Sequence, residues 1–90
     1  MQKRSIGDNI RRIRLQIPKK QSEVLRELHL KGHTITKSTY SKLENGIRSI
    51  AASELVALHE ILGADYAEFF EGISSEKDDT ENPIIYIKNR

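Results

Sequence analysis

Apolar residues recur at intervals of three and four positions through most of this 90-residue chain, which is the period of an α-helix. The series at the amino end is Ile6, Ile10, Ile13 and Ile17. We expect these side chains to share one face of a first helix, with Ser5 and Asp8 as its start signal and Pro18 as its end. Because only residues 84–87 resemble a strand, the sequence predicts an all-α fold.

A second helix is predicted from about Gln21, where Glu23 suits the positive first turn. Its apolar face is formed by Val24, Leu25 and Leu28. Gly32 is expected to break it, so a glycine-containing turn precedes the next helix.

The third predicted helix is short and mostly polar. Thr36 is its expected cap, and it ends at Glu44, where Asn45 and Gly46 form a left-handed stop. Its spacing buries Tyr40 and Leu43 together. The side chains on or beside the opposite face are Lys37, Ser38, Ser41 and Lys42. The segment therefore predicts a helix that is anchored on one side and presents hydrogen-bond donors on the other.

Two more helices complete the predicted domain, which spans residues 1–72. One covers about 50–62, with Ser49 as its cap and Gly63 as its end. The other covers 66–71 and begins with a capping box formed by Asp65 and Glu68. We expect this last helix to place two aromatic side chains in the core, Phe69 and Phe70.

Residues 73–90 differ in character from the rest. A polar and acidic stretch, 74–82, indicates a solvated linker. The β-forming run 84–87 behind Pro83 has two interpretations. It is either a frayed terminus or a short strand that pairs with another copy or packs back on the helices.

Charge is distributed unevenly along the chain. Residues 1–50 contain 12 Lys and Arg against 4 Asp and Glu, whereas residues 51–90 contain 3 against 9. This asymmetry favours a polyanion-binding face on the first half, and the alternative is a solvated basic surface. Cysteine is absent and no stretch resembles a signal peptide or a bilayer-spanning segment, so we expect a soluble, cytoplasmic protein.

Catalytic and metal sites are not expected. His29 and His33 are four residues apart, but Gly32 interrupts them and no carboxylate or cysteine completes a ligand set. No nucleophile has a recognisable base partner, and a helical domain of this size offers little cleft. We therefore predict no enzyme activity, no cofactor and no metal.

Two helices joined across a glycine-containing turn form a helix-turn-helix, whose second helix can enter the major groove of DNA. The segments IGDNIRRIR, QSEVLREL, ITKSTYSKLENGIRS and ELVALHEILGADYAEFF occur in that order. Together, over residues 6–70, they resemble the helix-turn-helix domain of the Cro and phage-repressor (C1) family, also called the XRE family. The resemblance implies a five-helix, lambda-repressor-like DNA-binding domain without catalytic activity.

The resemblance also implies roles for individual residues. The implied base contacts are Thr36, Lys37, Ser38 and Lys42. The implied phosphate contacts are Gln21, Ser41, Asn45 and Arg48. Arg14 and Glu44 are implied to form a structural ion pair that joins the first helix to the end of the third.

One departure from the family concerns the turn HLKGHTI, which is longer than usual. Either the second helix gains a turn or the connection is a longer loop. The longer turn also brings Lys31 and His33 into consideration as contacts to the DNA backbone.

The function that follows is that of a small transcriptional regulator, expected to be a repressor. Its expected partners are double-stranded DNA and a second copy of itself, held through residues 66–70 and the tail strand. An antitoxin-type regulator that binds a toxin through residues 73–90 is the alternative. A protein-interaction module without DNA contact is a third interpretation, and the positive charge of residues 1–50 argues against it.

Overall fold

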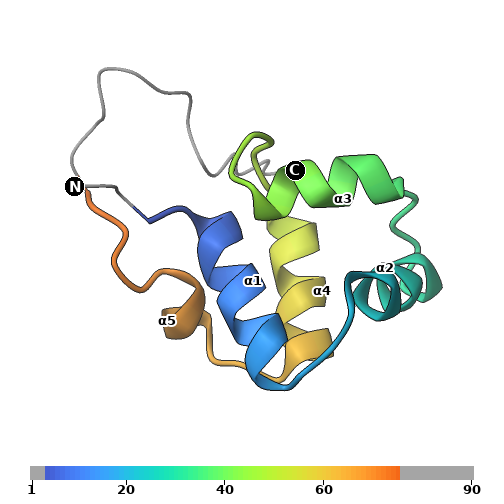
Figure 1. Ribbon diagram of the computed structural model, residues 1–90, viewed down its shortest axis with the longest axis horizontal. Helices are drawn as coiled ribbons and strands as arrows, with labels where there is room; N and C mark the ends of the chain where they lie inside the picture. Colours follow the sequence, from blue (N-terminus) through green and yellow to red (C-terminus); the bar gives the residue numbers. More distant parts are fainter. Residues whose placement is uncertain (1–3, 76–90) are drawn as a thin grey trace.

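Five helices make up the part of the chain that the computed structural model describes, residues 4–75 (Figure 1). They are α1 (Ile6–Gln16), α2 (Gln21–Leu30), α3 (Lys37–Glu44), α4 (Ala52–Leu62) and α5 (Tyr66–Phe69). No strand occurs within these residues. The predicted all-α fold of five helices is confirmed.

The helices pack around α1 and α4, which lie side by side at the centre of Figure 1. α3 crosses one end of this pair, and α2 contacts both α3 and α4. α5 packs against α1 on the side away from α2. This arrangement leaves one long side of α3 at the edge of the molecule.

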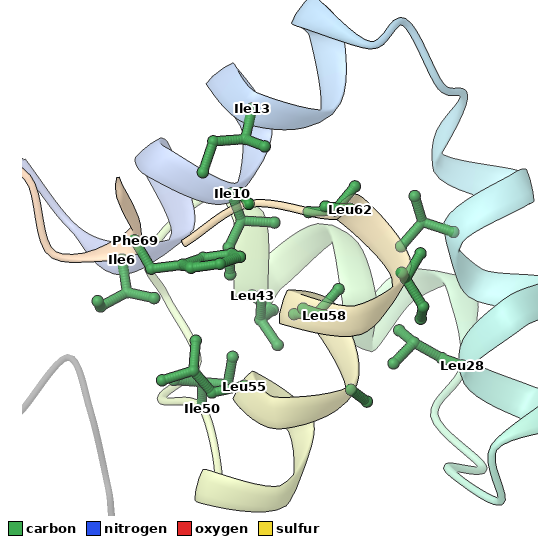
Figure 2. Packing of buried hydrophobic residues seen from close by; sticks show 14 of the residues in the cluster. Ile6, Ile10, Ile13, Leu28, Leu43, Ile50, Leu55, Leu58, Leu62 and Phe69 are labelled. Carbon is green, nitrogen blue, oxygen red and sulfur yellow. The ribbon is translucent and has the colours of Figure 1, made fainter. Parts of the chain in front are cut away.

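The core lies where the apolar faces of these helices meet, and Figure 2 shows its side chains converging between α1, α3 and α4. Its labelled members are Ile6, Ile10, Ile13, Leu28, Leu43, Ile50, Leu55, Leu58, Leu62 and Phe69. Burial of these side chains is the main stabilising contribution to the fold. It also fixes the position of α3, because Leu43 is one of the core residues.

The beginning of α1 is as predicted, but its end is not. The Ser5 hydroxyl accepts from the N–H of Asp8, and the Asp8 carboxylate accepts from the N–H of Ser5, each at 3.0 Å. The prediction that Ile17 lies on the buried face is wrong, since this side chain is 42% exposed. The helix ends at Gln16, so Ile17 falls in the turn that leads to α2.

Ser49 is not the cap of α4, which begins at Ala52, after Ala51. Ile50 is buried in the core and keeps this part of the chain close to the other helices. Ala51 has no side-chain acceptor, but its N–H donates to Glu54 Oε1 at 2.9 Å. Half of a capping box thus stabilises the start of α4.

The fifth helix is shorter than predicted and buries only one of its aromatic residues. Phe69 is fully buried, whereas Phe70 is 38% exposed, so the prediction that both enter the core is wrong. α5 ends at Phe69, and consecutive side chains on a single helical turn point about 100° apart. At its start the N–H of Asp65 donates to Glu68 Oε2 at 3.3 Å, while the Asp65 side chain makes no cap bond.

The connection between α2 and α3 combines both alternatives raised by its length. α2 continues past Leu28 to Leu30, and residues 31–36 then form a loop. Two contacts hold this connection in place. His29 Nε2 donates to the carbonyl of Ile35 at 2.7 Å, and Lys31 forms an ion pair with Glu60 on α4 at 2.8 Å.

α1 approaches the carboxyl end of α3 at backbone distance. A Cβ atom at Gly7 would lie 2.1 Å from the carbonyl oxygen of Leu43, so no larger residue fits there without a shift of the backbone. Two residues later, the buried side chain of Asn9 donates to the carbonyls of Phe69 and Glu71, at 2.8 and 2.9 Å. α1 therefore positions both α3 and the segment that ends α5.

Within residues 4–75 no helix has the length and apolar character needed to cross a membrane. The predicted linker and tail strand fall almost entirely on residues 76–90, which lie outside the described residues. Of the predicted linker and tail, the structure thus describes only residues 73–75, and Ile73 packs partly against the core.

Candidate nucleic-acid interface

α3 is held to the rest of the molecule by its inner face. Tyr40 and Leu43 are both fully buried, as their spacing predicts. Thr36 caps the helix, since its Oγ1 accepts from the N–H of Thr39 at 3.1 Å. A helix with so short an apolar face gains most of its stability from this packing and capping rather than from intrinsic propensity.

The outer face of α3 presents three polar side chains to solvent: Lys37, Ser38 and Lys42. None of them hydrogen bonds or forms an ion pair with another residue of the described part, 4–75. Lysine donates to base-edge or phosphate oxygens, and serine can donate or accept. The face is therefore equipped to bind an acceptor-rich surface.

Thr36 lies at the start of this face but is partly occupied. Its hydroxyl accepts from the N–H of Thr39 and donates to the hydroxyl of Thr39 at 2.9 Å. Since a hydroxyl has one proton and two lone pairs, only one acceptor position is left. The two hydroxyls thus satisfy each other in part, and Thr36 keeps one hydrogen-bonding position for a base.

Glu44 is the centre of a buried polar network beneath α3. Its carboxylate accepts from Arg14 at 2.7 Å (Nε to Oε2) and 3.0 Å (Nη2 to Oε1). It also accepts from the Tyr40 hydroxyl at 2.6 Å and from Gln21 Nε2 at 3.0 Å. The ion pair between Arg14 and Glu44 thus joins α1 to α3, and Gln21 adds α2.

Burial and hydrogen bonding have opposite effects on the pKa of Glu44. Burial disfavours the charged carboxylate, but the hydrogen bonds from Arg14, Tyr40 and Gln21 outweigh this and lower the pKa below its ordinary value. The pKa of the Tyr40 hydroxyl is raised, first by burial and then by its bond to Glu44. Tyr40 therefore stays protonated and donates to a charged acceptor.

The side chain of Gln21 is fixed between α2 and α3. Its Nε2 donates to Glu44, while its Oε1 accepts from the Ser41 hydroxyl at 3.2 Å. One Nε2 proton remains for a phosphate oxygen. The hydroxyl proton of Ser41 is already used, so Ser41 buttresses Gln21 here and would have to rotate to donate to phosphate itself.

The turn after α3 contains the other two expected phosphate contacts, Asn45 and Arg48. Asn45 is exposed, and Gly46 takes the left-handed conformation, with φ of 76°. Arg48 is not free, because its two terminal nitrogens contact both carboxylate oxygens of Glu54 at 3.1 and 2.8 Å. This pair lowers the pKa of Glu54 against the opposing effect of burial.

Lys31 and His33 lie elsewhere. Lys31 is paired with Glu60, and both it and His33 line a shallow hollow of about 310 Å³ against α4. Ser53 and Val56 of α4 also line this hollow. The structure thus places these two side chains beside α4, and their contact with the DNA backbone stays a prediction. His29 donates to a backbone carbonyl, and the described residues contain no group of three His, Cys, Asp or Glu side chains able to hold a metal ion.

A family model described as helix-turn-helix matches residues 10–69, which is most of the chain. The chain belongs to the helix-turn-helix family. It is a DNA-binding transcription regulator of the Cro and phage-repressor type. Searches of curated proteins and of solved structures gave no significant match. Within the matched range, α2 and α3 are consecutive helices joined by the loop 31–36.

Several residues that shape the helix-turn-helix site were not predicted from the sequence. They include Gly7, which lets α1 reach the end of α3, and Glu54, which holds Arg48. The hydroxyl of Tyr40 is a third, since spacing predicted only that this residue is buried. The one local signal was the position of Glu54 as the third residue of α4, where a carboxylate suits a helix start.

Proposed function

We propose that this regulator binds double-stranded DNA by placing the outer face of α3 in the major groove and that it acts as a repressor. The observation that supports this most strongly is the unpartnered set of donors on that face, Lys37, Ser38 and Lys42. The polar groups beneath the helix are satisfied by one another, so the outer set is not needed for folding.

In this proposal the outer donors select the sequence. Lysine pairs with the acceptors of guanine, and serine can pair with several bases, each good contact being worth about 1–3 kcal/mol of discrimination. Thr36 would add one more contact to a base edge through the hydrogen-bonding position that Thr39 leaves open.

Phosphate binding would come from the ends of α2 and α3. The amino end of α2 offers unpaired backbone N–H groups and the remaining Nε2 proton of Gln21. Asn45 is exposed in the turn after α3 and would contribute from the other side. Arg48 would contribute only while sharing its guanidinium with Glu54, and Ser41 mainly by orienting Gln21.

A homodimer on a palindromic site is the arrangement we propose, with half-sites about 10 base pairs apart. Exposed Tyr66 and Phe70 make α5 and the end of the domain the proposed contact between copies. The protein would act in the cytoplasm. The antitoxin alternative depends on residues 73–90, and nothing in residues 4–75 favours it.

Fluorescence anisotropy with labelled mixed-sequence duplex DNA, measured over a salt series, tests the proposal. The parent should lose affinity steeply with salt, because each neutralised phosphate contributes about 0.9 to the slope of log K against log salt. Lys37→Ala/Lys42→Ala should bind more weakly and with a smaller slope.

The matched control is Arg11→Ala/Arg26→Ala, which removes the same charge from exposed positions on α1 and α2 whose side chains pair with no other residue of 4–75. We expect the control to bind nearly as the parent does. Equal weakening of the two double variants would show that net charge rather than the face of α3 determines binding. No binding by the parent even at low salt would refute the proposed function.

A further inference from the structure

Ile47 is a large apolar residue that the fold itself does not use. Its side chain is 70% exposed, although it lies between α3 and the core residue Ile50. Ile50 is buried and already anchors this turn. The described part of the chain therefore leaves this side chain available to a partner.

The backbone of the turn fixes where this side chain lies. The N–H of Ile47 donates to the carbonyl of Lys42 at 2.9 Å, and the N–H of Gly46 donates to that of Leu43 at 3.2 Å. With Gly46 left-handed, this is a Schellman motif, which is frequently accompanied by an apolar contact between the residues at the positions of Ile47 and Lys42. The usual apolar partner is thus replaced by a lysine, which is itself exposed.

The surroundings of Ile47 favour DNA as the group that covers it. Lys42 lies beside it on the outer face of α3, and Asn45 is exposed in the same turn. The two carboxylates nearest to Ile47 in sequence are already engaged, Glu44 with Arg14 and Glu54 with Arg48. The surface is therefore apolar at one point and otherwise equipped with donors.

We propose that Ile47 is part of the DNA interface and packs against an apolar part of the DNA beside the position of Lys42. Two groups of DNA have this chemistry, the 5-methyl group of a thymine in the major groove and the deoxyribose of the backbone. The inference rests on the proposed function, because it needs the outer face of α3 to be bound to DNA. It adds a contact that is independent of charge.

The test compares the parent with Ile47→Ala by fluorescence anisotropy. The probe is a duplex that the parent selects from random sequences. Ile47→Ala should bind about five- to tenfold more weakly, since a few buried carbon atoms are lost. This loss should be the same at every salt concentration, because no charge is removed. Ile47→Leu should keep most of the affinity.

Leu15→Ala is the matched control. Leu15 is also an exposed aliphatic residue, at 51%, but lies in the last turn of α1 rather than on α3 or in the turn after it. The variant Leu15→Ala should bind the duplex as tightly as the parent does. Circular dichroism melts of all variants establish that each one is folded.

Replacing single thymines by 2′-deoxyuridine, which lacks the 5-methyl group, distinguishes a contact with a thymine methyl group from a contact with deoxyribose. If Ile47 contacts a methyl group, one replacement weakens the parent but not Ile47→Ala. If it contacts deoxyribose, every replacement affects both proteins equally, and the variant remains weaker throughout. Either result supports the inference.

Parent-like binding by Ile47→Ala, while Lys37→Ala/Lys42→Ala is weakened, would overturn this inference and leave the proposed function intact. Failure of the parent to bind DNA would overturn both. Sedimentation velocity tests whether Ile47 contacts a second copy of the protein instead of DNA. If Ile47→Ala loses self-association and its DNA binding is otherwise unchanged, Ile47 belongs to a protein interface and the inference is wrong.

Discussion

Replacing Glu44 by alanine should destabilise the domain more than any surface substitution. The carboxylate is 1% exposed and accepts four hydrogen bonds, two of them from Arg14. Its removal leaves the guanidinium of Arg14, which is 6% exposed, without its counter-charge. The Tyr40 hydroxyl and the Gln21 amide lose their acceptor at the same time.

The expected magnitude follows from leaving a buried charge unpaired. Breaking a buried ion pair from one side costs about 3–5 kcal/mol, and a domain of this size loses about 4–8 °C in Tm for each kcal/mol. Glu44→Ala should therefore melt about 12–40 °C below the parent. Total stability of such domains is only about 5–15 kcal/mol, so part of the variant could be unfolded at 25 °C.

Thermal and urea unfolding followed by circular dichroism at the helical band measures this loss. A second variant, Arg14→Met/Glu44→Leu, removes both charges and should be less destabilised than Glu44→Ala alone, because no unpaired charge is left. An unchanged melting temperature for Glu44→Ala would refute the reasoning. Equal losses in the two variants would show that packing, and not the uncompensated charge, accounts for the effect.

Three further predictions concern the same region. Gly7→Ala should lower the free energy of unfolding in urea by about 1–3 kcal/mol or more, because its Cβ would meet the Leu43 carbonyl. An unchanged free energy of unfolding would show that α1 can shift freely. Tyr40→Phe should cost about 1.5–3 kcal/mol, because the lost hydrogen bond has a charged acceptor, and a loss near zero would contradict that bond. The lowered pKa of Glu44 gives stability that is present above its ordinary pKa and is lost as pH falls through the folded-state pKa. The free energy of unfolding, measured from neutral to acidic pH, should thus fall less steeply below about pH 4.5 for Glu44→Gln than for the parent. Parallel curves of this free energy against pH would argue against the role of Glu44.

Much of the fold could be predicted because its signals are local. The capping box of Ser5 and Asp8, the Thr36 cap and the glycine stop after α3 each involve residues within a few positions of one another. Predictions were wrong where packing against a distant part of the chain determines the structure. Ile50, for example, is buried in the core, and α4 begins at Ala52, two residues later than the predicted cap at Ser49 implies.

For the site, the sequence predicted which side chains are buried but not how the side chains pair with one another. Spacing alone distinguished the buried Tyr40 from the outward Lys42, whereas the pairing of Arg14 with Glu44 was expected only from the family resemblance. Contacts between side chains of different elements left no periodic signal. The ion pair between Arg48, in the turn after α3, and Glu54, on α4, is one such contact, and it changes which cations are free to bind DNA.

Location of bound DNA on the protein is the most direct test of the central assignment. In ¹H–¹⁵N correlation spectra, titration with a duplex should shift the amides of residues 36–48 and of the start of α2 near Gln21. Amides of α5 and of the far end of α1 should change little, apart from effects of dimer formation. Largest shifts in residues 36–48 would establish α3 as the DNA-binding helix, whereas largest shifts in the hollow beside α4, with α3 unaffected, would contradict the account.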